Sequence, residues 1–99
     1  MAVLYITEYQ RLAAAQGAQV AAGQEPSVAE QNVAIGAGSL ASAAFNARTN
    51  FVRLHSDAIC SVAFGAAPTA VATAKRMAAN QTEFFGVNPG QKVAVITNT

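Results

Sequence analysis

The chain holds one histidine and one cysteine, the two side chains with the widest chemical range near neutral pH. His55 could act as a general base or as a metal ligand, because imidazole exchanges protons and binds metals under physiological conditions. The chain has no second histidine, and the nearest acid in the sequence is Asp57. General-base catalysis requires partners that position the ring, so we expect His55 to be a solvated or interface residue beside Arg53.

Cys60 could act as a nucleophile only if a nearby cation or a helix N-terminus lowered its pKa. A single cysteine forms no internal disulfide, and one cysteine with one histidine leaves too few ligands for a typical zinc site. A buried thiol commonly behaves as a small hydrophobic side chain. We therefore expect Cys60 to be an inert core residue.

The other residues that could do chemistry are dispersed. No spacing supports paired-carboxylate catalysis among the five acids, Glu8, Glu25, Glu30, Asp57 and Glu83. The turn Gly36-Ala37-Gly38 lacks the Lys-Ser/Thr that follows the glycines of a phosphate-binding loop. We interpret Lys75-Arg76 as a solvated basic doublet. The sequence thus predicts no enzyme, no catalytic or metal-binding residue and no cofactor.

Composition describes one small domain with few charges. The chain has 99 residues, of which 11% are charged and 53% hydrophobic, and its net charge is +1; a typical charged share is ~25%. Six scattered Lys and Arg form no basic stripe for nucleic acid. No apolar run approaches the ~20 residues of a membrane span, and the N-terminus lacks the basic start of a signal peptide. We expect a soluble protein, made in a cytoplasm, without nucleic-acid or membrane partners.

Short extended segments alternate with turn signals along most of the chain. The strand candidates are 3–6, 33–35, 40–45, 51–55, 59–64, a short piece near Met77, 82–87 and 92–97. A helix over 70–79 is the alternative for that part of the chain. Strands at this spacing predict an all-β fold, a small antiparallel β-sandwich or a jelly-roll-like barrel. Five phenylalanines occupy positions suited to its core: Phe45, Phe51, Phe64, Phe84 and Phe85.

Two β-hairpins are predicted. A three-residue loop at 56–58 places Leu54 opposite Cys60, and this register gathers one apolar face, namely Val52, Leu54, Cys60, Val62 and Phe64. Asn88-Pro89-Gly90-Gln91 is typical of a type II turn with Gly90 at φ > 0, and it predicts a hairpin between 82–87 and 92–97. The second hairpin would carry one face with Phe84, Val93 and Val95 and another with Phe85, Val87, Ala94 and Ile96. One face would meet the core and the other a neighbouring layer or subunit.

The first thirty residues differ from the rest. The part from about Leu12 to Glu30 is rich in Ala, Gln and Gly, and it shows neither the strand nor the helix period of apolar residues. A short helical turn at Leu12–Ala15 is weakened by Gly17 and Gly23. We expect an arm that contacts a neighbouring chain, and we divide the single domain into a strand and arm at 1–30 and a β-sandwich at 31–99.

Several stretches of residues 31–99 carry a family resemblance. They are Val33-Ala34-Ile35-Gly36, Ser42-Ala43-Ala44-Phe45-Asn46, Val52-Arg53-Leu54, Cys60-Ser61-Val62-Ala63-Phe64-Gly65, Gln81-Thr82-Glu83-Phe84-Phe85-Gly86-Val87 and Pro89-Gly90-Gln91-Lys92-Val93-Ala94-Val95-Ile96. Together they resemble small virion structural proteins of tailed bacteriophages. The resemblance implies a capsid decoration or cement protein on the virion surface. Its partners would be the major capsid protein and its own copies, as a dimer or trimer. The resemblance carries no site residues.

Two other classes of protein stay open. One is a small β-sandwich binding module of a fibre or tail, for instance a carbohydrate-binding one. Such sites usually combine exposed aromatics with clustered polar groups, whereas this chain has no Trp and two Tyr, both before residue 10. The other is a small jelly-roll metalloenzyme, for which one His and one Cys supply few ligands.

Overall fold

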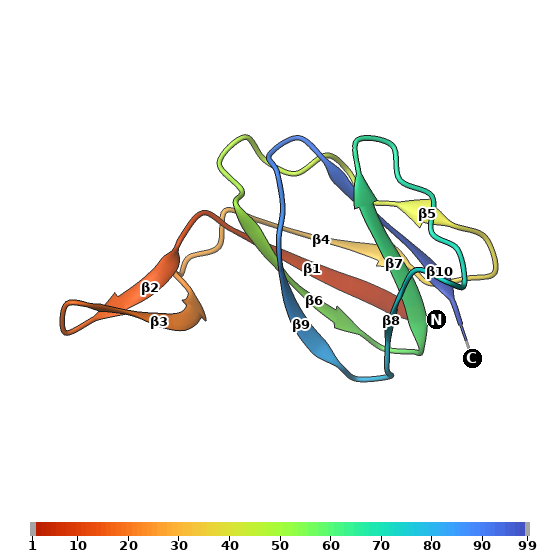
Figure 1. The fold of residues 1–99 in the computed structure, drawn as a ribbon, viewed down its shortest axis with the longest axis horizontal. Coiled ribbons are helices and arrows are strands. Elements are labelled where there is room, and N and C mark those ends of the chain that lie inside the picture. Colours follow the sequence, from red (N-terminus) through yellow and green to blue (C-terminus); the bar gives the residue numbers. More distant parts are fainter. Residues whose placement is uncertain (1, 99) are drawn as a thin grey trace.

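The computed structural model describes residues 2–98, and the fold of these residues is all-β, as predicted (Figure 1). It has no helix within that range. The ten strands are β1 (Val3–Tyr9), β2 (Leu12–Ala15), β3 (Ala18–Gly23), β4 (Ala29–Ala34), β5 (Leu40–Ala41), β6 (Phe51–Ser56), β7 (Cys60–Gly65), β8 (Lys75–Met77), β9 (Thr82–Gly86) and β10 (Lys92–Thr97).

Two four-stranded antiparallel sheets form a sandwich. Sheet I has the strand order β4-β1-β6-β9, and sheet II has the order β5-β10-β7-β8. A separate two-stranded sheet, β2-β3, projects from one end of the sandwich (Figure 1). The molecule accordingly measures 45 Å along its longest axis but only 25 and 22 Å along the others.

The core lies between the two sheets and is built from alternate residues of each strand, because successive side chains of a strand point to opposite faces. Sheet I contributes Leu4, Ile6, Val33, Val52 and Leu54, and sheet II contributes Cys60, Val62, Met77, Val93 and Val95. Cys60 is completely buried, which confirms its predicted place in the core. Burial also raises the pKa of its thiol, as expected for an inert cysteine.

The predicted hairpin between 51–55 and 59–64 is wrong. β6 pairs with β1 and β9 in sheet I, whereas β7 pairs with β10 and β8 in sheet II. Four of the five predicted inward residues are nevertheless buried in one shared cluster, Val52 and Leu54 from one sheet and Cys60 and Val62 from the other. The fifth, Phe64, is partly buried against that cluster. The alternation of apolar and polar residues reveals which side chains point inward. It does not reveal whether two such strands pair within one sheet or face each other from opposite sheets of a sandwich.

The second predicted hairpin fails for the same reason. Gly90 has a φ of +82°, and Gln91 N donates to Asn88 O at 3.3 Å, so the turn has the expected positive φ. However, the turn connects β9 in sheet I with β10 in sheet II. Phe85, rather than Phe84, packs against the core that contains Val93. Phe84 is 47% exposed on the opposite face of β9.

Two further segments differ from expectation. The predicted strand over 40–45 is a regular strand only at Leu40–Ala41, although Phe45 is buried in the core as expected. The segment 70–79 is not helical and contains only the short strand β8, in line with the strand predicted near Met77.

The chain leaves the sandwich after β1 and returns at β4, and between them it forms a regular hairpin, where the sequence predicts no element of its own. β1 is an inner strand of sheet I, between β4 and β6. Gln16 and Gly17 have φ angles of 51° and 80° and form the two-residue turn between β2 and β3. Two positive φ angles are characteristic of the type I′ turn that fits the twist of a hairpin. We call residues 12–23 the hairpin arm.

Candidate functional site

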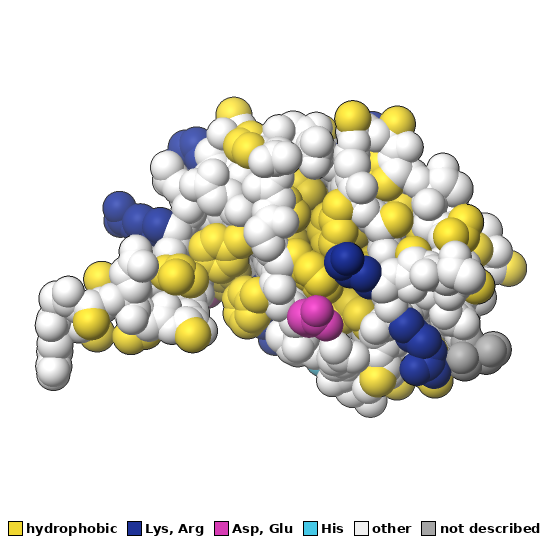
Figure 2. Space-filling model, viewed as in Figure 1, with side chains coloured by type: hydrophobic (Ala, Val, Ile, Leu, Met, Phe, Trp, Pro, Cys, Tyr) yellow, Lys and Arg dark blue, Asp and Glu magenta, His cyan; other side chains and the backbone are white. Residues whose placement is uncertain are grey.

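The hairpin arm presents an uncharged surface to solvent. It contains no Asp, Glu, Lys or Arg, and every residue in it is exposed except the half-buried Ala13 and Gly23. Its largest apolar side chains, Leu12 and Val20, are 38% and 40% exposed. Small apolar side chains are spread along the projecting arm (Figure 2). The arm is therefore an apolar element that the rest of its own domain does not cover.

Side chains at the root of the arm fix its direction. Tyr9, at the end of β1, is buried; its ring stacks on Phe51 at 5.3 Å, and its hydroxyl donates to Glu25 Oε2 at 2.7 Å. Burial and this hydrogen bond raise the pKa of Tyr9 to about 12. A Cβ at Gly23 would lie 2.4 Å from the Tyr9 ring, so the close approach of β3 to this ring requires glycine.

Backbone hydrogen bonds hold both ends of the arm at the same place. Gln24 N donates to Arg11 O at 3.0 Å, which closes the hairpin at its base. Val28 N donates to Glu8 O at 2.8 Å, which docks the returning chain on β1. The arm thus leaves the sandwich from a bonded base and not from a free tether.

An apolar groove lies where the arm meets the outer face of sheet I. Its volume is about 210 Å³, and its lining consists of Leu12, Ala21, Ala22, Phe51 and Phe84. The rings of Phe51 and Phe84 have centroids 6.2 Å apart. Both phenylalanines were predicted as core residues, but the structure places them on this outer face. Apolar side chains gather at this junction in the space-filling view (Figure 2).

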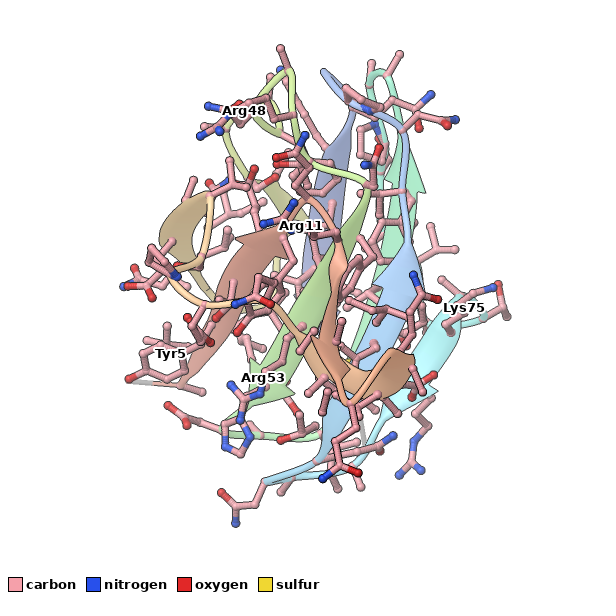
Figure 3. All side chains as sticks on the ribbon, turned by 90° about the vertical axis from the view of Figure 1, so that its left-hand side faces the viewer. Tyr5, Arg11, Arg48, Arg53 and Lys75 are labelled. Atoms are coloured by element: carbon pink, nitrogen blue, oxygen red, sulfur yellow. The ribbon has the colours of Figure 1, made fainter. Side chains whose placement is uncertain are left out.

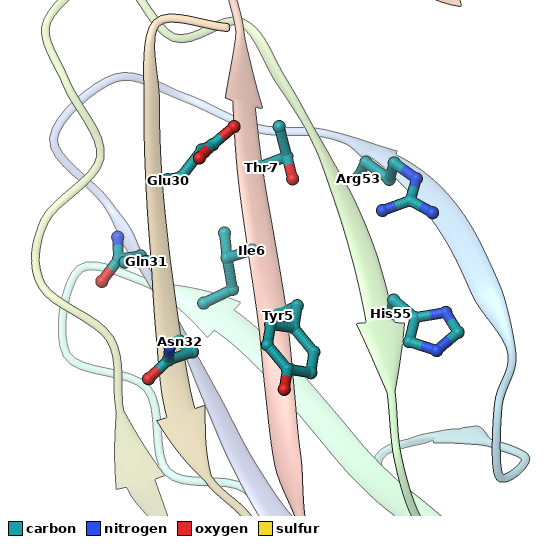
Figure 4. Close-up of a pocket in the computed structure, with 8 residues that line it drawn as sticks. All are labelled: Tyr5, Ile6, Thr7, Glu30, Gln31, Asn32, Arg53 and His55. Atoms are coloured by element: carbon teal, nitrogen blue, oxygen red, sulfur yellow. The ribbon is translucent and has the colours of Figure 1, made fainter.

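A polar depression of about 450 Å³ lies on the same outer face of sheet I (Figure 4). Its lining comes from three adjacent strands: Tyr5, Ile6 and Thr7 of β1, Glu30, Gln31 and Asn32 of β4, and Arg53 and His55 of β6. The strand register arranges the outward side chains in two cross-strand rows. One row is Glu30, Thr7 and Arg53, and the next is Asn32, Tyr5 and His55.

His55 lies at one side of this depression. As expected it shares a face with Arg53, and its Nδ1 is 2.8 Å from Thr82 Oγ1. Asp57, the nearest acid in sequence, is exposed and does not line the depression. Sequence reasoning did not identify Tyr5, Glu30 or Asn32 as its neighbours, because only the strand register brings these distant residues together.

The view along the arm shows on which side of the molecule the labelled side chains lie (Figure 3). Tyr5 and Arg53 lie on the outer face of sheet I, and Lys75 lies on the other side of the molecule. Lys75-Arg76 is exposed, but it belongs to the edge strand β8 rather than to a loop tip. Arg11 and Arg48 line a second depression, of about 280 Å³, at the root of the arm.

The sequence did not mark Glu8 as an interior residue, yet the structure buries it. It points into the molecule and is only 2% exposed. Its Oε1 accepts hydrogen bonds from Asn46 N at 2.8 Å and Thr49 Oγ1 at 2.7 Å, and its Oε2 accepts one from Gln31 Nε2 at 3.0 Å. These bonds satisfy a buried carboxylate and tie the 46–49 loop to sheet I, so the role of Glu8 is structural.

Comparison with protein-family models, with curated proteins and with solved structures finds no match to this chain. Within residues 2–98, no helix is long and apolar enough to cross a membrane. The same residues contain no cluster of three or more His, Cys, Asp or Glu side chains that could hold a metal ion.

Proposed function

We propose that the protein is a structural subunit of a bacteriophage virion, a capsid decoration or cement protein that attaches through its hairpin arm. The resemblance of residues 31–99 to small virion proteins supports the class. The observation that carries the mode of attachment is the arm itself, an uncharged hairpin that projects from a bonded root. Such an element has no evident use in an isolated domain.

The free edges of the arm support a role in assembly. A two-stranded sheet leaves one side of each strand without backbone partners, and natural proteins usually protect such edges with charged residues, proline or bulges. The arm has one register shift, between Leu12 and Ala14, but no charged residue and no proline. An edge of this kind can accept a strand from another chain, which requires few specific side chains.

The apolar groove beside the arm extends the same surface. Leu12 belongs both to the arm and to the groove, so a partner that lies along the arm would also reach Phe51 and Phe84. Burial of apolar surface contributes about 25 cal/mol per Å². We propose that the major capsid protein covers this surface, and that copies of the chain associate as a dimer or trimer on the capsid.

Removal of the arm tests the proposal. Because Arg11 O and Gln24 N are 3.0 Å apart, a Gly-Gly bridge can replace residues 12–23 without displacing the ends of the sandwich. We expect this variant to keep its β-sheet circular dichroism and cooperative unfolding but to lose binding to phage capsids that lack the subunit. A folded variant that binds such capsids as well as the intact chain would refute attachment through the arm.

The number of copies per particle tests the class separately. A decoration protein should be present in many copies, in fixed proportion to the major capsid protein, as measured by quantitative mass spectrometry of purified virions. A handful of copies would indicate a tail or fibre component instead. Absence from the purified virion would contradict the proposed class altogether.

A further inference from the structure

We propose that the polar depression on the outer face of sheet I binds a neutral hexose unit of a glycan. Sequence reasoning counted against a carbohydrate site, because the chain has no Trp and its two Tyr both lie before residue 10. The fold nevertheless exposes Tyr5 and places it among polar side chains, between Asn32 on one neighbouring strand and His55 on the other. This inference does not depend on the proposed virion role.

The size of the depression suits a small ligand. Its volume of about 450 Å³ lies in the range of small-molecule sites. Glu30 and Arg53 flank Thr7 on the two strands beside β1. Since adjacent strands are about 4.8 Å apart, these two side chains start roughly 10 Å from each other. Thr7 and Tyr5 lie on β1, between the strands that carry Glu30 and Arg53 (Figure 4), and we place a single pyranose ring over them.

The side chains around the depression match the chemistry of a sugar. The Tyr5 ring is 45% exposed and offers a flat apolar surface to the C–H face of a pyranose. Glu30 and Asn32 supply acceptors on one side, and Arg53 supplies several donors on the other. Each sugar hydroxyl both donates and accepts, so a ring placed between these groups could bond to both sides.

The polar groups are also available. No hydrogen bond to another residue in the range 2–98 occupies the side chain of Tyr5, Asn32 or Arg53. A ligand would therefore replace only water at these groups, without breaking bonds within the protein. Glu30, in contrast, already accepts a hydrogen bond from Ser27 Oγ at 3.1 Å.

The charge distribution favours a neutral ligand over a charged one. Glu30 opposes Arg53 across the same cross-strand row, so the face is not a one-signed field that would attract a phosphate or a polyanion. The same lining argues against an apolar ligand, since polar side chains dominate it. A neutral hexose fits this lining better than a charged or an apolar ligand, because it has hydroxyl groups around its rim and an apolar ring face.

Nuclear magnetic resonance titration of the full chain tests the site. The probes are glucose, galactose, mannose and N-acetylglucosamine, each added as the free sugar, with inorganic phosphate as a separate arm. We expect at least one sugar to shift the amide signals of β1, β4 and β6 around Tyr5, Asn32 and Arg53. Tyr5→Ala and Arg53→Ala should each weaken that binding about tenfold or more.

Matched variants separate loss of the site from loss of the fold. Arg76→Ala removes an exposed cation on sheet II and should leave sugar binding unchanged. Tyr5→Phe keeps the ring and should retain most of the binding, with thermal unfolding recorded for every variant. The proposal is overturned if none of the four sugars shifts these signals, if the shifts fall on another surface, or if only phosphate binds.

Discussion

The sandwich and the hairpin arm are built from the same local structure, but their side chains have opposite surroundings. In β6, Val52 and Leu54 are completely buried between the sheets. In the arm, Leu12 and Val20 remain more than a third exposed. An isolated two-stranded hairpin is marginally stable in water. The arm therefore depends on its root and its turn, while the sandwich depends on its core.

The same substitution made in both regions should give the largest contrast. Leu54→Ala removes a completely buried side chain, and we expect it to reduce the free energy of unfolding by about 2–5 kcal/mol. Leu12→Ala removes an exposed side chain of the arm and should change it by less than about 0.5 kcal/mol. Urea unfolding of the two variants measures both effects. Similar losses would show that the arm belongs to the cooperative core.

High pH should weaken the root of the arm through Tyr9. Its pKa is raised from 10.0 in the unfolded chain to about 12 in the fold, so the folded state holds the phenolic proton more tightly. The contribution of this raised pKa to the free energy of unfolding is fully present below pH 10 and is lost as the pH rises toward 12. It amounts to about 2–3 kcal/mol in the free energy of unfolding.

Tyr9→Phe isolates this contribution, because it keeps the ring on Phe51 and removes the ionisable hydroxyl. The variant should be less stable than the natural chain at pH 8, since it lacks the bond to Glu25. Its disadvantage should shrink as the pH rises from 10 to 12. A stability difference that stays constant over that interval would contradict the raised pKa.

A pair of glycine substitutions distinguishes the root of the arm from an ordinary strand. Gly23→Ala would place a Cβ 2.4 Å from the Tyr9 ring, so the ring or the arm must shift. We expect a loss of about 1–3 kcal/mol in the free energy of unfolding. Gly86→Ala, in β9, meets no atom within 4 Å and serves as the control. Equal effects of the two variants on thermal unfolding would refute the contact with Tyr9.

The sequence was sufficient to predict the fold class and the inward side chains of the sandwich. The alternation in 51–55 and 59–64 correctly selects Val52, Leu54, Cys60 and Val62 for the core. It cannot predict the strand pairing, because a short link can join neighbours within a sheet or carry the chain to the opposite sheet. Both predicted hairpins failed at this point.

The arm and the polar depression escaped prediction for two other physical reasons. The arm buries neither of its faces, so no selection for alternating apolar residues marks it as a hairpin. The depression combines residues from β1, β4 and β6 that are brought together only by register. Tyr5 and His55 are fifty positions apart in the chain, yet they are direct cross-strand partners.

The smallest expected effect concerns the turn of the arm. Gln16 and Gly17 both have positive φ, and asparagine adopts this backbone conformation more readily than glutamine does. Gln16→Asn should therefore stabilise the arm by about 0.5 kcal/mol, which slows amide exchange in β2 and β3 about twofold. Exchange in β6 should not change, because the sandwich does not share the turn. Hydrogen exchange followed by nuclear magnetic resonance measures both regions in one sample. Equal or faster exchange in the arm of the variant would refute the left-handed turn, and slower exchange throughout the molecule would show that arm and sandwich unfold as one unit.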